Sequence, residues 1–165
     1  MEFNIIEVLR SICNTHPNIK SFNVNSSYDN TVIDTYPAVL FDTESVRLKT
    51  DDEWAEITFT LYGLDVNDLI SDDTAPKNLI QYPMDVNEVK CYKKMYSYLQ
   101  QIANRIDELY EDQMINFRII GTRQFETVLE INDDKASGIS LTITVITPIE
   151  CHTVNWGDDT LSITN

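Results

Sequence analysis

The adjacent residues Cys151 and His152 form the only neighbouring thiol and imidazole in this sequence. A cysteine nucleophile needs its histidine on the same side of the chain and within hydrogen-bond reach. Successive side chains of a strand point to opposite faces, so an extended chain would separate the pair. The other histidine, His16, precedes Pro17 at the end of an expected helix, which favours a solvated capping role. We therefore expect neither a catalytic dyad nor a metal site at these residues.

Two acidic stretches, residues 65–68 and 132–134, offer oxygen atoms that could bind a cation. Neither follows the pattern of an EF-hand loop, because Leu69 and Ala136 occupy the next ligand positions and the required glycine is missing. Two interpretations stay open, an incidental cation site and a solvated acidic loop. We expect no metal ion or other cofactor to be required.

Other motifs of catalysis or nucleotide binding do not occur in the sequence. Four glycines are too few for a glycine-rich phosphate loop, and the surroundings of Ser140 are not those of a nucleophile elbow. The basic cluster Lys90, Lys93 and Lys94 is too small for duplex binding and favours a solvated helix face that pairs with nearby acids. We therefore expect that the protein is not an enzyme.

The composition excludes several partners. The chain has 165 residues, with 27 acidic and 12 basic side chains and a net charge of −15. This charge argues against wrapping nucleic acid and against binding an anionic membrane. The first residues lack a signal-peptide pattern, no apolar run could span a bilayer, and the three cysteines are widely spaced and odd in number. We expect reduced cysteines, no membrane, and synthesis in a cytosol.

Helical periodicity predicts two helices that could position these residues. Apolar side chains recur at helical spacing over residues 3–15, and again over residues 89–112, where the pattern is unusually long. Asp85, followed by Glu88, predicts the N-cap of the long helix. Tyr92, Tyr96 and Tyr110 follow core spacing on it, so we expect all three to pack in the core.

Alternating patterns predict the strands. We expect an extended segment or edge strand over 22–30, strands over 38–41 and 46–49 that a turn at 42–45 separates, and a strand over 55–61. Short segments over 117–120 and 123–131 follow the long helix, and the latter forms a hairpin with residues 139–145. The predicted fold is α+β, a mostly antiparallel twisted sheet packed against one long helix and an N-terminal helix.

No repeat or linker divides the chain, so we expect a single domain over residues 1–165. Residues 63–84 form a long insertion loop, and residues 156–165 form a polar tail. The loop exceeds the usual length of a connection and combines apolar with acidic side chains. We expect it to act as a docking arm that a neighbouring subunit orders; the alternative is a surface loop packed on its own domain.

The order of elements resembles that of tail-terminator and neck proteins of tailed bacteriophages. An N-terminal amphipathic helix ends at HPN (16–18), YPAVLF (36–41) and EITFTLY (56–62) follow, and after the long helix the pattern closes with VITPIE (145–150). The choice of Asn, Asp, Ile and Tyr is similar to virion proteins of phages of gut Bacteroidota, including the crAss-like group. The long loop over 63–84 departs from a minimal terminator.

This resemblance implies a structural virion protein of the head-to-tail connector, a neck or tail-completion ring around the DNA channel. It implies contacts with further copies of the chain and with portal, adaptor and tail proteins, while DNA passes without specific binding. It also implies assembly in the bacterial host cytoplasm. Acidic side chains that faced the channel would repel the passing DNA.

We single out exposed apolar and acidic residues as candidates for these contacts. The candidate subunit or ring interface comprises Leu69, Ile70, Leu79, Ile80, Tyr82, Trp156, Leu161 and Ile163. The candidate acidic lumen or surface residues are Asp72, Asp73, Asp133 and Asp134. The alternative function is a soluble, non-enzymatic interaction or regulatory domain, and a hydrolase with an unrecognised site is a distant third.

Overall fold

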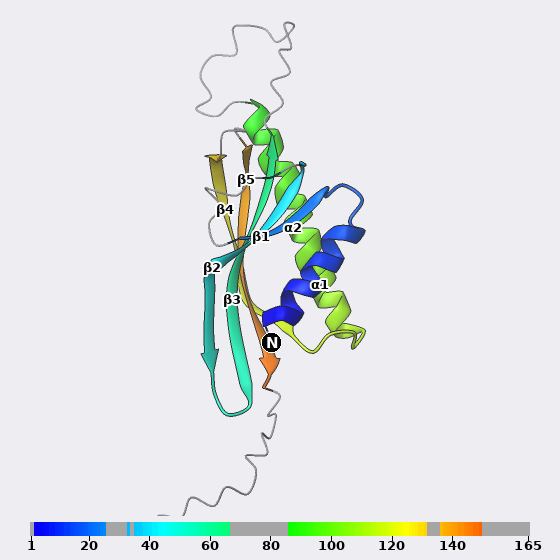
Figure 1. Cartoon of the computed structure of the whole chain (residues 1–165), viewed down its shortest axis with the longest axis vertical. Helices are drawn as coiled ribbons and strands as arrows, with labels where there is room; N and C mark the ends of the chain where they lie inside the picture. The colour runs from blue at the N-terminus through cyan, green and yellow to red at the C-terminus, as the bar shows by residue number, and fades with distance from the viewer. Residues whose placement is uncertain (1, 26–32, 34, 67–85, 132–135, 150–165) are drawn as a thin grey trace, which may run out of the picture.

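The structure, a computed structural model, describes residues 2–25, 33, 35–66, 86–131 and 136–149. The elements in chain order are α1 (Glu2–Thr15), β1 (Ser21–Asn25), β2 (Ala38–Thr50), β3 (Trp54–Val66), α2 (Val86–Glu111), β4 (Arg118–Ile131) and β5 (Ala136–Pro148). The strands form one sheet in the order β1-β2-β3-β5-β4, and both helices lie on the same side of it (Figure 1).

The sheet is mostly antiparallel, which confirms the predicted α+β class. Among the described strands, only β1 runs parallel to its neighbour β2, and it lies at the edge of the sheet. The predicted hairpin of β4 and β5 is present, and β5 also pairs with β3 along its whole length. The last described strand therefore occupies an interior position in the sheet.

Both helices bury the apolar side chains that their periodicity indicated. In α1, Ile5 and Leu9 are fully buried, and Thr15 ends the helix by donating its hydroxyl to the backbone oxygens of Ser11 and Ile12. In α2 the fully buried side chains include Met95, Leu99, Ile102, Ala103 and Ile106. The two helices share one core with the sheet, so one continuous apolar interior holds the described elements together.

Period-two alternation in β3 and β5 separates a core face from a polar face. Ile57, Phe59 and Leu61 are buried beneath the helices. On the opposite face, the Thr58 hydroxyl lies 2.8 Å from that of Thr144, and a second threonine pair follows at 2.9 Å. A smaller cluster of Ile33, Ala38, Leu64 and Ala136 packs at one end of the sheet.

The predicted turn over residues 42–45 is wrong, because these residues form a bulge within the continuous strand β2. The Asp42 carboxylate accepts a hydrogen bond from the Glu44 amide at 2.9 Å. The Ser45 hydroxyl donates to the Asp42 carbonyl at 2.7 Å and accepts from the Thr60 amide of β3 at 2.8 Å. Side chains thus replace the interrupted ladder bonds, so the strand continues.

The predicted division between residues 117–120 and 123–131 is also wrong. These segments belong to the single strand β4, whose register shifts between Ile120 and Gln124. Gly121 has a φ of 70° within this shift, a conformation that glycine adopts at little cost. Taken alone, the local sequence around Gly121 predicts a turn. Pairing with β5 on both sides of the register shift keeps the two segments in one strand.

One boundary and one packing prediction also need correction. Residues 63–66, assigned to the long loop, continue β3, while residues 67–85 lie outside the described part. Tyr92 is buried as expected, but Tyr96 and Tyr110 are 47% and 40% exposed. Tyr96 packs at the margin of the core, with its ring centroid 4.6 Å from that of Phe125 on edge strand β4, and Tyr110 lies in the last turn of α2.

Candidate functional site

The interface residues proposed from the sequence fall outside the part of the chain that the structure describes. These are Leu69, Ile70, Leu79, Ile80, Tyr82, Trp156, Leu161 and Ile163, together with the acidic residues Asp72, Asp73, Asp133 and Asp134. Cys151, His152 and the proposed N-cap Asp85 lie outside it as well. All of them stay predictions.

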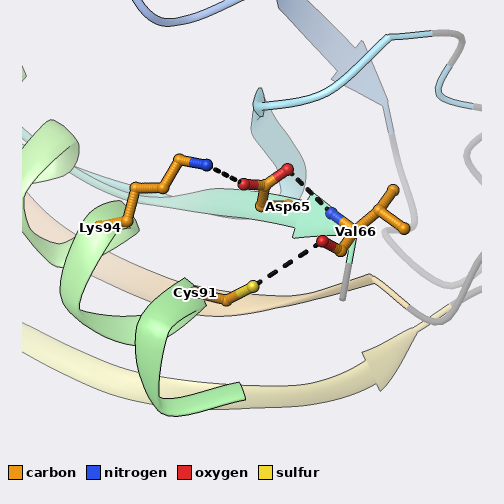
Figure 2. A network of polar contacts seen from close by, with 4 residues as sticks. All are labelled: Asp65, Val66, Cys91 and Lys94. Carbon is orange, nitrogen blue, oxygen red and sulfur yellow. Dashed lines mark hydrogen bonds and ion pairs between the residues drawn. The ribbon is translucent and has the colours of Figure 1, made fainter. Parts of the chain in front are cut away.

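A polar contact joins the start of α2 to the end of β3 (Figure 2). Lys94 forms an ion pair with Asp65, whose second oxygen accepts the Val66 amide at 2.9 Å. The hydrogen bond to Asp65 raises the pKa of Lys94, while partial burial opposes the shift. The Cys91 thiol lies 3.9 Å from the Val66 carbonyl oxygen. A cation at Asp65 would therefore have to displace an ammonium group.

The basic cluster on α2 divides into one paired and two solvated lysines. Lys90 and Lys93 are exposed, and no ion pair joins either to a described residue.

Among the residues with described positions, no group of three His, Cys, Asp or Glu side chains could hold a metal ion. Nor is either described helix long and apolar enough to cross a membrane.

The end of α1 and the middle of α2 enclose a polar cleft of about 360 Å³. Its lining residues are Ile12, Thr15, His16, Pro17, Gln101, Asn104, Arg105 and Glu108. His16 is not the solvated cap that the sequence predicts: its Nε2 lies 2.9 Å from the Gln101 amide oxygen, and its ring packs against Tyr98. The helix end lies against α2, so the imidazole is half-buried between them.

The polar groups of this cleft bind one another. The Asn18 amide donates to His16 Nδ1 at 3.2 Å, and Arg105 donates to Glu108 at 2.7 Å. Arg123 of β4 donates to Asn104 and forms an ion pair with Asp107. The contact of His16 with Gln101 joins the end of α1 to α2, and the contacts of Arg123 join β4 to α2, which is a structural role. Sequence reasoning missed these contacts between elements because local patterns do not reveal which distant residues meet.

The distal end of the β2–β3 hairpin exposes large apolar side chains. The hairpin extends beyond the ends of both helices, with residues 51–53 at its tip (Figure 1). Leu48 is 61% exposed and Trp54 is 44% exposed. Register places Leu48 on the helix side of the sheet, opposite Ile57, whereas Trp54 shares the other face with Thr58. We call residues 47–54 the hairpin arm.

The arm is a formed structure that carries two basic side chains and, at its tip, three acidic ones. The Asp51 carboxylate accepts the Glu53 and Trp54 amides at 2.9 and 2.7 Å, and these bonds lower its pKa. The exposed Arg47 and Lys49 lie on the same face as Trp54.

No family model matches the sequence, and no curated protein matches it significantly. Within the described residues, the arm is therefore the best candidate for a functional contact.

Proposed function

We propose that this protein is a structural subunit of the head-to-tail connector of a tailed phage, a neck or tail-completion ring around the DNA channel. The hairpin arm carries the proposal. Leu48 and Trp54, in the two strands that lead to its tip, are 61% and 44% exposed. Contact with another subunit would remove this apolar surface from water.

The occupant that best fits the arm is an acidic protein surface, which a further copy of the chain supplies. Arg47 and Lys49 share the face of Trp54, opposite to Leu48, and the tip carries Asp51, Asp52 and Glu53, while the whole chain has a net charge of −15. An arm that docks on the body of the next copy makes a heterologous contact, and such contacts generate rings when the rotation closes. The resemblance in element order to phage neck proteins supports the same assembly.

The net charge also fits a channel through which DNA must move. A subunit with 27 acidic and 12 basic residues repels a phosphate backbone over most of its surface. A lumen built from such subunits holds no base or phosphate in place. We infer that DNA passes the ring without specific binding, that portal, adaptor and tail proteins contact its two sides, and that the protein resides in the virion.

The alternative is an interaction or regulatory domain that uses the same arm to bind an unlike protein. It also accounts for Leu48 and Trp54, but it requires neither a ring nor incorporation into a particle. The location of the protein separates the two functions.

The test uses a phage whose genome encodes this chain. Mass spectrometry of purified virions should find the protein at a fixed ratio to the portal protein, and deletion of its gene should leave filled heads and tails unjoined. The double variant Leu48→Ser/Trp54→Ser should reproduce that phenotype. Met114→Ser, which changes a side chain that is 72% exposed elsewhere, should leave infectious particles.

Absence of the protein from virions would refute the connector function. If it were recovered instead in a stable complex with an unlike protein in infected cells, the interaction domain would be supported. Joined, infectious particles in the double variant would show that the arm does not make the ring contact.

A further inference from the structure

Helix α2 carries two charged triads of opposite sign with the same internal spacing. Lys90, Lys93 and Lys94 lie near its beginning, and Glu108, Glu111 and Asp112 lie at its end. All six side chains are exposed. The amide of Asp112 still bonds to the Glu108 carbonyl at 2.9 Å, so the second triad keeps helical geometry throughout.

The two triads lie on the same face of the helix. Each acid follows the corresponding lysine by 18 residues, and 18 residues make about five turns at 3.6 residues per turn. With a rise of about 1.5 Å per residue, the triads are about 27 Å apart along the helix. Between them this face carries the exposed side chains of Ser97, Gln101, Asn104 and Arg105, and His16 at the end of α1 borders it through its contact with Gln101.

The acidic triad at the end of α2 opposes the helix dipole. Cations are favourable near the end of a helix and anions near its beginning, and the last turn of α2 contains no basic residue. Intramolecular pairing accounts for only part of the charge. Lys94 binds Asp65 and Glu108 binds Arg105, while Lys90, Lys93, Glu111 and Asp112 have no ion pair among the described residues.

We propose that this face of α2 binds the same face of α2 in a second copy of the chain, with the two helices antiparallel about a twofold axis near Gln101. In this arrangement Lys90 lies opposite the partner's Asp112, and Lys94 lies opposite the partner's Glu108. Each basic triad meets an acidic triad at both ends of the contact, and the helix dipoles are antiparallel. A parallel arrangement in register would place like charges together.

The contact is isologous and separate from the heterologous arm contact proposed above, so it does not depend on the connector function. It fits two free copies, and it also fits copies in two rings that face each other. Exposed ion pairs are individually weak and salt-dependent, so we expect a reversible dimer that dissociates as ionic strength rises.

A zero-length carbodiimide cross-linker tests this placement directly on the full chain. It joins an amine to a carboxylate only where the two are in contact. Lys90 or Lys93 cross-linked to Glu111 or Asp112 must come from two molecules, because these positions lie about 27 Å apart along one helix. We expect such cross-links in the dimer band at low ionic strength, identified by mass spectrometry, and their loss at high salt.

Charge reversal supplies the matched controls. Lys90→Glu/Lys93→Glu and Glu111→Lys/Asp112→Lys should each lower dimer affinity by at least about 10-fold, since opposed charges then repel at both ends. An equimolar mixture of the two variants should dimerise again, as should the chain with all four substitutions, whose net charge equals that of the original. Arg10→Glu/Lys20→Glu, an equal charge change at exposed positions elsewhere, should not weaken the dimer.

Failure of the mixture to restore the dimer, or the absence of cross-links between the triads, would overturn the proposal. Dimers of undiminished affinity in the two charge-reversal variants would overturn it too. None of these results bears on the arm or on incorporation into virions, which the preceding experiments measure separately.

Discussion

Single residues at the ends of elements account for much of the local geometry. At the end of α2 the Met114 amide bonds to the Leu109 carbonyl at 2.9 Å, and the Gln113 amide bonds to the Tyr110 carbonyl at 3.0 Å. This is the Schellman arrangement, which places one residue in the left-handed region. That residue is Gln113, with a φ of 59°, where glycine is most often found.

Gln113→Gly should therefore stabilise the protein by about 1 kcal/mol, because glycine adopts a positive φ without the steric cost of a side chain. Urea unfolding followed by circular dichroism would measure the change. As a matched control, Gln100→Gly inside α2 should destabilise the protein by about 1 kcal/mol. An unchanged or lower stability of Gln113→Gly would contradict the strain assigned to this position.

The thiol of Cys13 gives a prediction for alkaline pH. Burial of this α1 side chain in the core raises its pKa from 9.0 to about 12. Because the folded-state pKa exceeds the unfolded one, the stabilising effect is complete below pH 9.0 and is lost as pH rises toward about 12. Above pH 9.0 the free energy of unfolding should fall by up to about 1.4 kcal/mol per pH unit relative to Cys13→Ala.

The measurement compares urea unfolding of the original chain and Cys13→Ala between about pH 7 and about pH 10.5, so that the cavity left by the substitution cancels. A constant difference between the two proteins across this range would show that the thiol of Cys13 ionises as readily in the folded state as in the unfolded state.

Elements were predictable where a regular pattern extends over several turns or alternations. The stripe around Leu99 in α2 and the alternation through Phe59 in β3 gave both element types correctly. The bulge at Asp42 was not predictable, because its side-chain bonds mimic a turn until Thr60 of the neighbouring strand is in place. Pairs such as Lys94 with Asp65 depend on how α2 meets the sheet, which local patterns do not encode.

The candidate contact residues also differ in whether the sequence indicated them. The hairpin arm was not anticipated, because Leu48 and Trp54 belong to strands whose alternation resembles that of buried segments. The only signal in the sequence is that both lie next to the acidic turn at residues 51–53. The twelve interface and lumen residues chosen from the sequence lie outside the described residues and stay predictions.

Leu99→Asp tests the packing of α2 on the sheet. Leu99 is fully buried and packs beside Gly63 of β3, so a carboxylate there would be buried without a partner. The expected loss of stability is about 3–5 kcal/mol, enough to unfold a marginally stable domain. Thermal unfolding would detect it. Ser97→Asp, two residues away and exposed, should change the midpoint little; equal midpoints of both variants would contradict the packing.

At the scale of the whole molecule, net charge opposes compactness. A charge of −15 on 165 residues produces self-repulsion that the three described ion pairs offset only locally. The same repulsion limits non-specific contact between copies. Association therefore requires local complementarity, which the basic side chains of the hairpin arm and of α2 provide.

Raising the ionic strength from about 10 mM to about 150 mM should raise the thermal midpoint, because salt screens repulsion between exposed carboxylates. Differential scanning calorimetry with sodium chloride would measure this shift. It should be recorded with Lys90→Glu/Lys93→Glu as well, so that dimer dissociation does not contribute. A midpoint that fell with salt in both proteins would show that attractive pairs outweigh the excess of acids.

The interior position of β5 has a consequence for synthesis on the ribosome. The partner strand β3 ends at Val66, whereas β5 begins at Ala136, so 69 residues are made between the two halves of the central ladder. Because synthesis proceeds at about 5–20 residues per second, several seconds pass before the edge of β3 that pairs with β5 has its partner strand. The nascent chain is therefore exposed to chaperones and to aggregation until its last described strand arrives, and premature termination before Ala136 leaves a polypeptide that cannot close its sheet.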